Sequence, residues 1–160
     1  MRRWMVLVAG VVALGLIAGG VSIAGSDYER GRGRVLRFLD VSEEVEYLDL
    51  GPPAEGDFDP SPGDTFFFSN TLRNLADTKT KGRFVSKCTA LIGTEFRCLG
   101  TLMLQRGNIE LATTVDFAAE EPLVAAVTGG TGKYRGVGGE ATITPTETEG
   151  VSKLVVKLTR

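Results

Sequence analysis

Apolar and polar residues alternate along short segments of this chain, and this pattern limits its possible folds more than any other feature. In the segment 108–117, Ile109 and Leu111 fall on one face and Glu110 on the other. The segment 152–159 alternates in the same way. A two-residue period is that of a half-buried strand, and no window after residue 26 sustains the helical period of about 3.6 residues. We therefore predict an all-β domain.

Turn-forming residues divide the domain into candidate strands, and segment 50–64, rich in proline and glycine, is predicted to be a long loop. Roughly eight antiparallel strands joined by short turns suit a closed barrel or a sandwich. The interior of such a barrel holds either packed side chains or one small ligand. The candidate strands are 34–41, 44–50, 65–73, 83–91, 95–105, 108–117, 122–127, 139–144 and 152–159.

The first 25 residues differ from the rest, because two arginines precede an uncharged, largely apolar run that continues to Ser26. Ser22 and Ala24 have the spacing that signal peptidase prefers, which predicts cleavage near Gly25. The alternative is an uncleaved membrane anchor over residues 4–24, because the run is nearly long enough to span a bilayer. We expect a hydrophobic export helix in 1–25, a linker in 26–33 and one domain in 34–160. Both alternatives predict a secreted or extracytoplasmic domain.

The composition excludes several classes of function. The chain has 18 basic and 20 acidic side chains, so no basic surplus is available to neutralise a nucleic-acid backbone. It has no histidine. Serine and cysteine hydrolase triads and histidine-based zinc sites are therefore excluded, and we predict neither a metal site nor a cofactor.

The two cysteines lie in neighbouring candidate strands on either side of Gly93 and Thr94. If Ile92, Gly93 and Thr94 form the tip of a hairpin, Cys88 faces Cys98 directly. At a non-hydrogen-bonded pair the two Cα atoms are about 4.5 Å apart, which allows a disulfide. In an oxidising compartment we favour this disulfide. The alternative is a pair of small buried thiols.

The segment "AVTGGTGKYRGVGGEATI" contains six glycines and Lys133. A phosphate-binding loop requires a serine or threonine after the Gly-Lys pair, but Tyr134 stands there. A dinucleotide fingerprint requires a third glycine where Arg135 stands, and the following residues are poor helix formers. We therefore interpret the glycines as a tight turn between two strands, the second of them sharply bent.

The same stretch resembles a signature of the allene oxide cyclase and dirigent protein superfamily of eight-stranded barrels, here "AVTGGTGKYRGVGGEA". A second block, "GDTFFFSNTLRN" followed by Cys88, is similar to a cyclase motif, and "SKLVVKLT" is similar to the carboxy-terminal strand of those proteins. The resemblance covers roughly residues 34–160. It implies a closed eight-stranded antiparallel barrel with an apolar cavity, and family members of both kinds suggest a homo-oligomer, either a dimer or a trimer.

The resemblance also implies candidate site residues. Asn70 and Cys88 match cavity residues of the plant cyclases, and Asp40 is the nearest match to a dirigent aspartate. We expect Asp40 and Asn70 to be catalytic, with the alternatives of a turn aspartate and a structural amide. The glutamate, asparagine and Ser-Pro of the cyclase first strand are not reproduced, and Val137 stands near the place of a dirigent arginine.

Other ligand-binding candidates come from the pattern itself. Phe66 and Phe68 share one strand face, so at least one ring is expected to face the cavity, with core filling as the alternative. Tyr134 and Arg135 either close the barrel mouth or form an aromatic corner plug with a solvated arginine.

Three functions follow. The barrel binds an apolar small molecule and directs its cyclisation or stereoselective coupling, as an isomerase or cyclase without metal or histidine. Alternatively, it is a non-catalytic carrier of an apolar ligand, or a secreted structural barrel with a filled interior. The membrane is expected as a partner only through an uncleaved leader, and nucleic acid is not expected.

Overall fold

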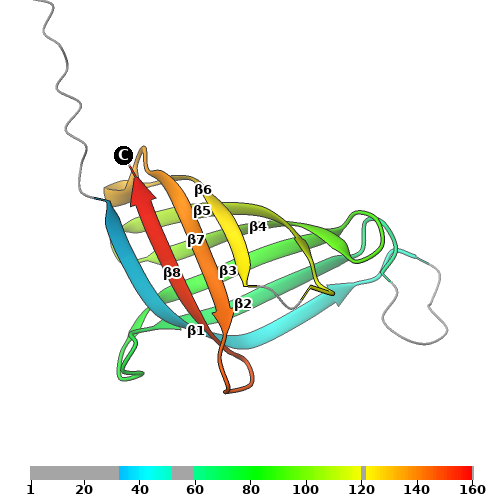
Figure 1. Ribbon diagram of the computed structural model, residues 1–160, viewed down its shortest axis with the longest axis horizontal. Coiled ribbons are helices and arrows are strands. Elements are labelled where there is room, and N and C mark those ends of the chain that lie inside the picture. The colour runs from blue at the N-terminus through cyan, green and yellow to red at the C-terminus, as the bar shows by residue number, and fades with distance from the viewer. Residues whose placement is uncertain (1–32, 52–59, 120–121, 160) are drawn as a thin grey trace, which may run out of the picture.

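The computed structural model describes residues 33–51, 60–119 and 122–159, which form one closed antiparallel barrel (Figure 1). Each strand pairs with the next along the chain, and the last pairs with the first, so the predicted eight-stranded barrel is confirmed. The predicted leader, and the predicted linker except for its last residue, lie outside the described residues. The strands are β1 Arg34–Leu48, β2 Thr65–Arg73, β3 Thr80–Ala90, β4 Glu95–Leu104, β5 Gly107–Asp116, β6 Leu123–Gly130, β7 Gly138–Pro145 and β8 Val151–Thr159.

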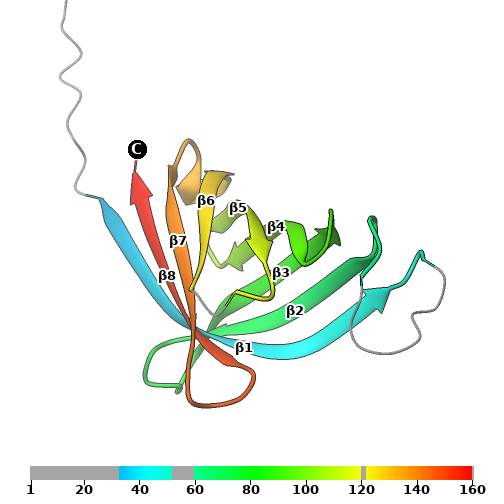
Figure 2. The ribbon, with the colours of Figure 1, turned by 45° about the vertical axis from the view of Figure 1, so that its right-hand side comes forward.

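The first strand, β1, unites the two segments 34–41 and 44–50 that the sequence predicted as separate strands. Its register against β2 shifts between Ser42 and Glu44, which leaves Glu43 as the extra residue of a β-bulge. The bulge bends the strand instead of ending it. The first half of β1 pairs with β8 and its second half continues along β2, so this strand closes the barrel (Figure 2).

The barrel separates locally between β5 and β6. These strands pair only from Ile109 to Ala112, whereas β4 and β5 pair along their whole length. Beyond that point, the Thr113 hydroxyl donates a 2.7 Å hydrogen bond to the carbonyl oxygen of Val124. Figure 2 shows the ends of β1 to β4 turned away from β6 and β7. The pairing of β5 with β6 is therefore the shortest in the barrel.

The interior contains two clusters of buried apolar side chains. The larger cluster includes Leu72, Leu102 and Leu154, which are fully buried, and it fills the half of the barrel near the amino end of β1. The smaller cluster is formed by Cys88, Ala90, Phe96 and Cys98, with Phe66, Phe68 and Val115 packed against it. The alternation predicted from the sequence is confirmed in β8, where Leu154, Val156 and Leu158 are buried. A cavity lies between the two clusters and is lined by residues of both.

The glycine-rich segment forms the end of β6, a short 3₁₀ turn at Gly132–Tyr134, and the start of β7. This confirms the predicted turn. Gly139 has a φ of 136°, and a Cβ atom there would lie 2.0 Å from the carbonyl oxygen of Lys157. Glycine is needed at this position because β7 approaches β8 too closely for any side chain.

We expect Gly139→Ala to destabilise the barrel by about 2 kcal/mol, because both the backbone conformation and the contact with Lys157 oppose a Cβ atom. Gly136→Ala is the matched control. Its φ of 72° is also unfavourable, but no atom lies within 4 Å of the added carbon. It should cost about 1 kcal/mol. Urea unfolding of both variants measures the difference, and equal costs would contradict the role assigned to the close approach.

Asp64 is buried and joins the two ends of the predicted loop 50–64, whose residues 52–59 lie outside the described part of the chain. Its carboxylate accepts hydrogen bonds from the Leu50 amide, the Tyr47 hydroxyl and the Ser61 amide, at 2.8, 2.7 and 2.8 Å. The amide of Leu50 and the Tyr47 hydroxyl lower the pKa of Asp64, and the Asp64 carboxylate in turn raises the pKa of Tyr47 to about 12. Asp64 is therefore a structural acid that remains charged.

Candidate functional site

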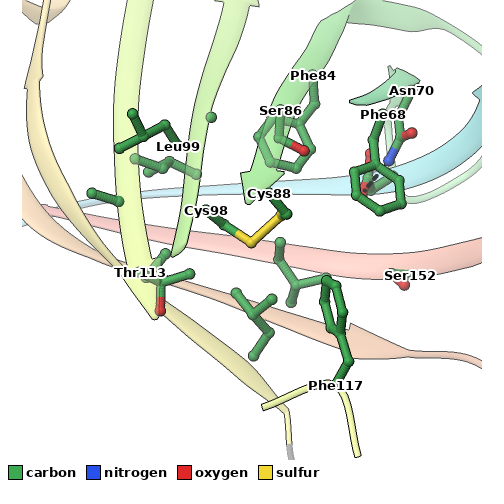
Figure 3. Close-up of a pocket in the computed structure, with 17 residues that line it drawn as sticks. Phe68, Asn70, Phe84, Ser86, Cys88, Cys98, Leu99, Thr113, Phe117 and Ser152 are labelled. Carbon is green, nitrogen blue, oxygen red and sulfur yellow. Dashed lines mark hydrogen bonds between the residues drawn. A yellow bond between two sulfur atoms is a disulfide. The ribbon is translucent and has the colours of Figure 1, made fainter. Parts of the chain in front are cut away.

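A cavity of about 320 Å³ lies between the two apolar clusters (Figure 3). It is within the size of sites that hold one small molecule. Thr113 and Leu123, on either side of the separation between β5 and β6, both line it. The other lining residues are mostly apolar or small: Asp40, Phe68, Asn70, Phe84, Ser86, Cys88, Cys98, Leu99, Gly100, Leu111, Ala112, Phe117, Ala125, Ile143 and Ser152.

Asp40 and Asn70 lie together in the wall of this cavity. Asp40 is in β1 and Asn70 in the neighbouring strand β2, where their side chains share the inner face. The Asn70 amide nitrogen (Nδ2) donates a 3.0 Å hydrogen bond to the Asp40 carboxylate (Oδ2). The second oxygen of each side chain, Oδ1, is buried and has no hydrogen-bond partner in the protein. Buried acceptors without a donor are costly, so this pair is suited to receive one from a ligand.

Burial raises the pKa of Asp40 from 3.8 to about 6, and the hydrogen bond from Asn70 opposes this rise. Only 5% of Asp40 is exposed. Among the residues that line the cavity, no lysine or arginine stabilises the carboxylate. Asp40 therefore changes its protonation state close to neutral pH, as a general acid or base must.

The predicted disulfide is present, and Cys88 and Cys98 also line the cavity (Figure 3). The two residues face each other across β3 and β4, with their Cα atoms 4.0 Å apart. The hairpin tip has the predicted arrangement, since the Leu91 amide donates to the Glu95 carbonyl. Cys88 therefore has no free thiol, and its disulfide forms part of the cavity wall. A disulfide is typical of an extracytoplasmic environment.

Of the phenylalanines in β2, Phe68 lines the cavity and Phe67 faces outward with 39% of its surface exposed. Phe66 is not among the lining residues. Its ring stacks on Tyr47 and packs edge-on against Phe96, with ring centroids 4.6 and 5.7 Å away. Phe66 therefore fits the alternative of a ring that fills the core, whereas Phe68 faces the cavity as expected of a ligand-binding ring.

Tyr134 and Arg135 are not among the residues that line this cavity, and their positions match the alternative of an aromatic corner plug with a solvated arginine. Tyr134 is buried in the larger apolar cluster below the 3₁₀ turn, with the guanidinium of Arg34 5.8 Å from its ring centre. Arg135 is exposed to solvent. The turn places both residues at the amino end of β1, away from Asp40, because glycines on either side allow Tyr134 to plug that end.

Several lining residues were not predicted. Ser152 faces Asp40 across the pairing of β8 with β1, and Ser86, Ala125 and Ile143 come from β3, β6 and β7. The sequence showed that these residues alternate with outward-facing ones, but only the pairing of β1 with β8 brings Ser152 next to Asp40.

In the described part of the chain, no group of three or more Cys, Asp or Glu side chains could hold a metal ion. Nor does any helix in those residues have the length and apolarity needed to cross a membrane.

Comparisons with known proteins yield structural matches only. No family model and no curated protein sequence matches the chain. A solved structure named pyocyanin demethylase has a TM-score of 0.66 and 27% identity, covering 79% of this chain and 100% of its own. AbnU, named an exo-specific intermolecular Diels-Alderase, has a TM-score of 0.60 and 16% identity, covering 80% and 98%. The pterocarpan synthase dirigent protein GePTS1 has a TM-score of 0.60 and 14% identity, covering 79% and 83%.

The chain has the barrel fold of the allene oxide cyclase and dirigent superfamily. This confirms the resemblance based on the glycine signature and the "GDTFFFSNTLRN" block. The likeness to AbnU and GePTS1 is one of fold, because identities of 14 and 16% are too low to transfer an activity. In this barrel, Asp40 and Asn70 lie in the cavity wall, and their catalytic role stays a prediction.

Proposed function

We propose that this barrel binds one apolar, ring-containing small molecule and directs its cyclisation or coupling, with Asp40 exchanging a proton with the ligand. The observation that carries the proposal is the Asp40–Asn70 pair, buried in the wall of an otherwise largely apolar cavity. Neighbours named as a Diels-Alderase and a dirigent protein support this class of reaction.

Two contributions account for catalysis in this proposal. The cavity holds the reacting atoms of one molecule, or of two small ones, close together, which lowers the entropic part of the barrier. Asp40 then donates a proton to the group on which negative charge develops, or removes one from a cationic intermediate. Asn70 positions the carboxyl group through its hydrogen bond. Phe68 and the disulfide exclude water from the reacting atoms.

A second candidate function is demethylation. The neighbour named pyocyanin demethylase is 27% identical to this chain, whereas AbnU and GePTS1 are 16% and 14% identical. Incubating the purified protein with pyocyanin, and measuring by mass spectrometry whether one methyl group is lost, tests this candidate. An unchanged pyocyanin mass would favour cyclisation or coupling.

Native mass spectrometry of the full-length protein purified from its own host's envelope tests ligand binding. We expect an apolar small molecule to co-purify with it. Incubating the released compound with fresh protein then separates an enzyme from a carrier, because an enzyme converts the compound and a carrier returns it unchanged. Protein that carries no ligand and binds no aromatic probe would contradict the proposal and favour a structural barrel.

Filling the cavity should weaken the binding of an aromatic ligand. Ala125 is 3% exposed and lines the cavity, whereas its neighbour Val124 is 50% exposed and faces outward. We expect Ala125→Leu to weaken the binding of 1-ethylnaphthalene by at least about tenfold, because the added methyl groups occupy the site of the ring. Val124→Leu should leave affinity unchanged. Fluorescence titration measures both, with circular dichroism as the check on folding, and equal affinities would place the ligand elsewhere.

A further inference from the structure

A second cavity, of about 340 Å³, adjoins the first and shares Asp40, Phe68, Asn70 and Ser152 with it. We call it the side chamber. Its other lining residues belong to β1, to the facing ends of β7 and β8, and to the connection between them: Ser42, Pro145, Val151, Thr146, Thr148, Glu149 and Gly150. The Asp40–Asn70 pair therefore stands where a largely apolar cavity meets a largely polar one.

The side chamber lies next to the bulge in β1, with Ser42 in its wall. Pairing between β1 and β8 ends at Val41 and Val151, and the next link is a 2.8 Å hydrogen bond from the Ser42 amide to the Gly150 carbonyl. Beyond Ser42 the strand turns away from β8 along β2. Figure 2 shows the β7–β8 connection projecting below β1 at this point. Asp40 therefore borders a second, more polar cavity on the side of the β7–β8 connection.

The charges around the side chamber have one sign. Asp40 and Glu149 are the charged residues that line it, and no lysine or arginine is among its lining residues. Ser42, Thr148 and Ser152 add hydroxyl groups. Asp40 and Asn70 are 5% and 9% exposed, and the Oδ1 atom of each has no donor in the protein. A lining of acceptors and carboxylates favours a positively charged donor and repels an anion.

We propose that the side chamber binds a positively charged amino substituent of a ligand whose ring system occupies the apolar cavity. The proposal rests on the proposed function for the position of the ring system. Its own basis is the chamber, the acidic lining and the buried acceptors at the junction. An ammonium group there donates to Asp40 or Asn70 while Glu149 adds attraction from the hairpin. This assigns the ligand class as an amphiphilic aromatic amine.

Three probes with the same ring and different substituents test the proposal on the full-length protein at pH 7.5. They are 2-(1-naphthyl)ethylamine, which is a cation, 1-ethylnaphthalene, which is neutral, and 1-naphthylacetate, which is an anion. Fluorescence titration should show the cation binding at least about tenfold more tightly than the anion, because one charge-assisted hydrogen bond contributes about that factor.

Variants test which residues produce the preference for the cationic probe over the anionic probe. Glu149→Gln should reduce the preference for the cation about threefold, since Glu149 lines the chamber and is exposed to solvent screening. Glu147→Gln is the matched control, because Glu147 is exposed on the same hairpin and does not line the chamber. Ser152→Leu, which narrows the junction, should weaken cation binding more than binding of 1-ethylnaphthalene.

The outcomes separate this proposal from the proposed function. Equal affinities for the cation and the anion, or an equal effect of the Glu147 and Glu149 variants, would overturn the side-chamber assignment while the apolar site stands. Binding of the cation without binding of 1-ethylnaphthalene would instead overturn the proposed position of the ring system. If none of the three probes binds, both proposals fail.

Discussion

Asp40→Asn is expected to make the folded barrel more stable at pH 7.5 and to remove most of its activity. Burial raises the pKa of Asp40 from 3.8 to about 6, so the folded protein binds this proton more tightly than the unfolded chain does. The stabilising effect of the bound proton is complete below pH 3.8 and is lost as the pH rises through 6. Above that pH, the buried carboxylate costs up to about 3 kcal/mol.

Asparagine carries no charge and keeps the shape of the side chain, so the variant avoids this cost. Urea unfolding should show similar stability of the two proteins at pH 3.5 and a difference of up to about 3 kcal/mol in favour of the variant at pH 7.5. Asp116→Asn is the control. The Thr94 hydroxyl and the Ala118 amide lower the pKa of Asp116, so neutralising it should bring no gain at pH 7.5.

The same substitution removes the acid or base of the proposed reaction. We expect turnover of the identified substrate to fall by about 10²- to 10⁴-fold, with affinity for the uncharged probe 1-ethylnaphthalene retained. The pH dependence of turnover in the unmodified protein should show a transition near the pKa of Asp40, about 6. Full activity of Asp40→Asn would contradict proton transfer by Asp40 and would show that the barrel acts only by holding the reacting atoms together. A variant no more stable than the parent at pH 7.5 would show that Asp40 is not destabilising when charged.

Loss of the disulfide is expected to have the second large effect. Cys88 and Cys98 are ten positions apart, and closing a loop of that length stabilises a folded domain by about 3 kcal/mol in the chain-entropy treatment. For a domain of this size, that difference lowers the Tm by about 10 °C. The Cys88→Ser, Cys98→Ser double variant should therefore melt at a lower temperature than the parent, as should the parent treated with reductant.

The disulfide also forms part of the cavity wall, so its loss should affect binding. It links β3 to β4 beside Phe96, and both sulfurs belong to residues that line the cavity. We expect the double variant to bind 1-ethylnaphthalene several-fold more weakly, because two hydroxyl groups replace the apolar disulfide. Reductant added to the double variant is the control and should change neither Tm nor affinity. If the Tm of the parent protein did not change on reduction, the disulfide would not stabilise the fold as expected here.

Local patterns predicted much of this molecule. The alternation in segments 108–117 and 152–159, together with the turn residues between strands, was enough for an all-β domain of about eight strands. The resemblance to the allene oxide cyclase and dirigent superfamily then favoured a barrel over a sandwich. The spacing of the cysteines about Gly93 was enough for the disulfide, because a hairpin register is fixed by its own turn. The Gly132 and Gly139 region was correctly interpreted as a turn, since the missing serine and helix excluded a phosphate loop.

Other features depended on contacts between distant segments. The sequence predicted two strands before residue 50, because a bulge at Glu43 and a turn have similar local signals. Tyr134 and Arg135 follow a recognisable turn, but which end of the barrel that turn closes depends on the pairing of β6 with β5 and β7.

The sequence by itself determined the strands, the turn glycines and the cysteine pair, because each depends on residues within about a dozen positions of one another. Only the tertiary structure decided that Asp40 is buried beside Asn70 and opposite Ser152, at the meeting of two cavities. Burial raises the pKa of Asp40, and burial comes from closing β1 against β8 across the length of the domain.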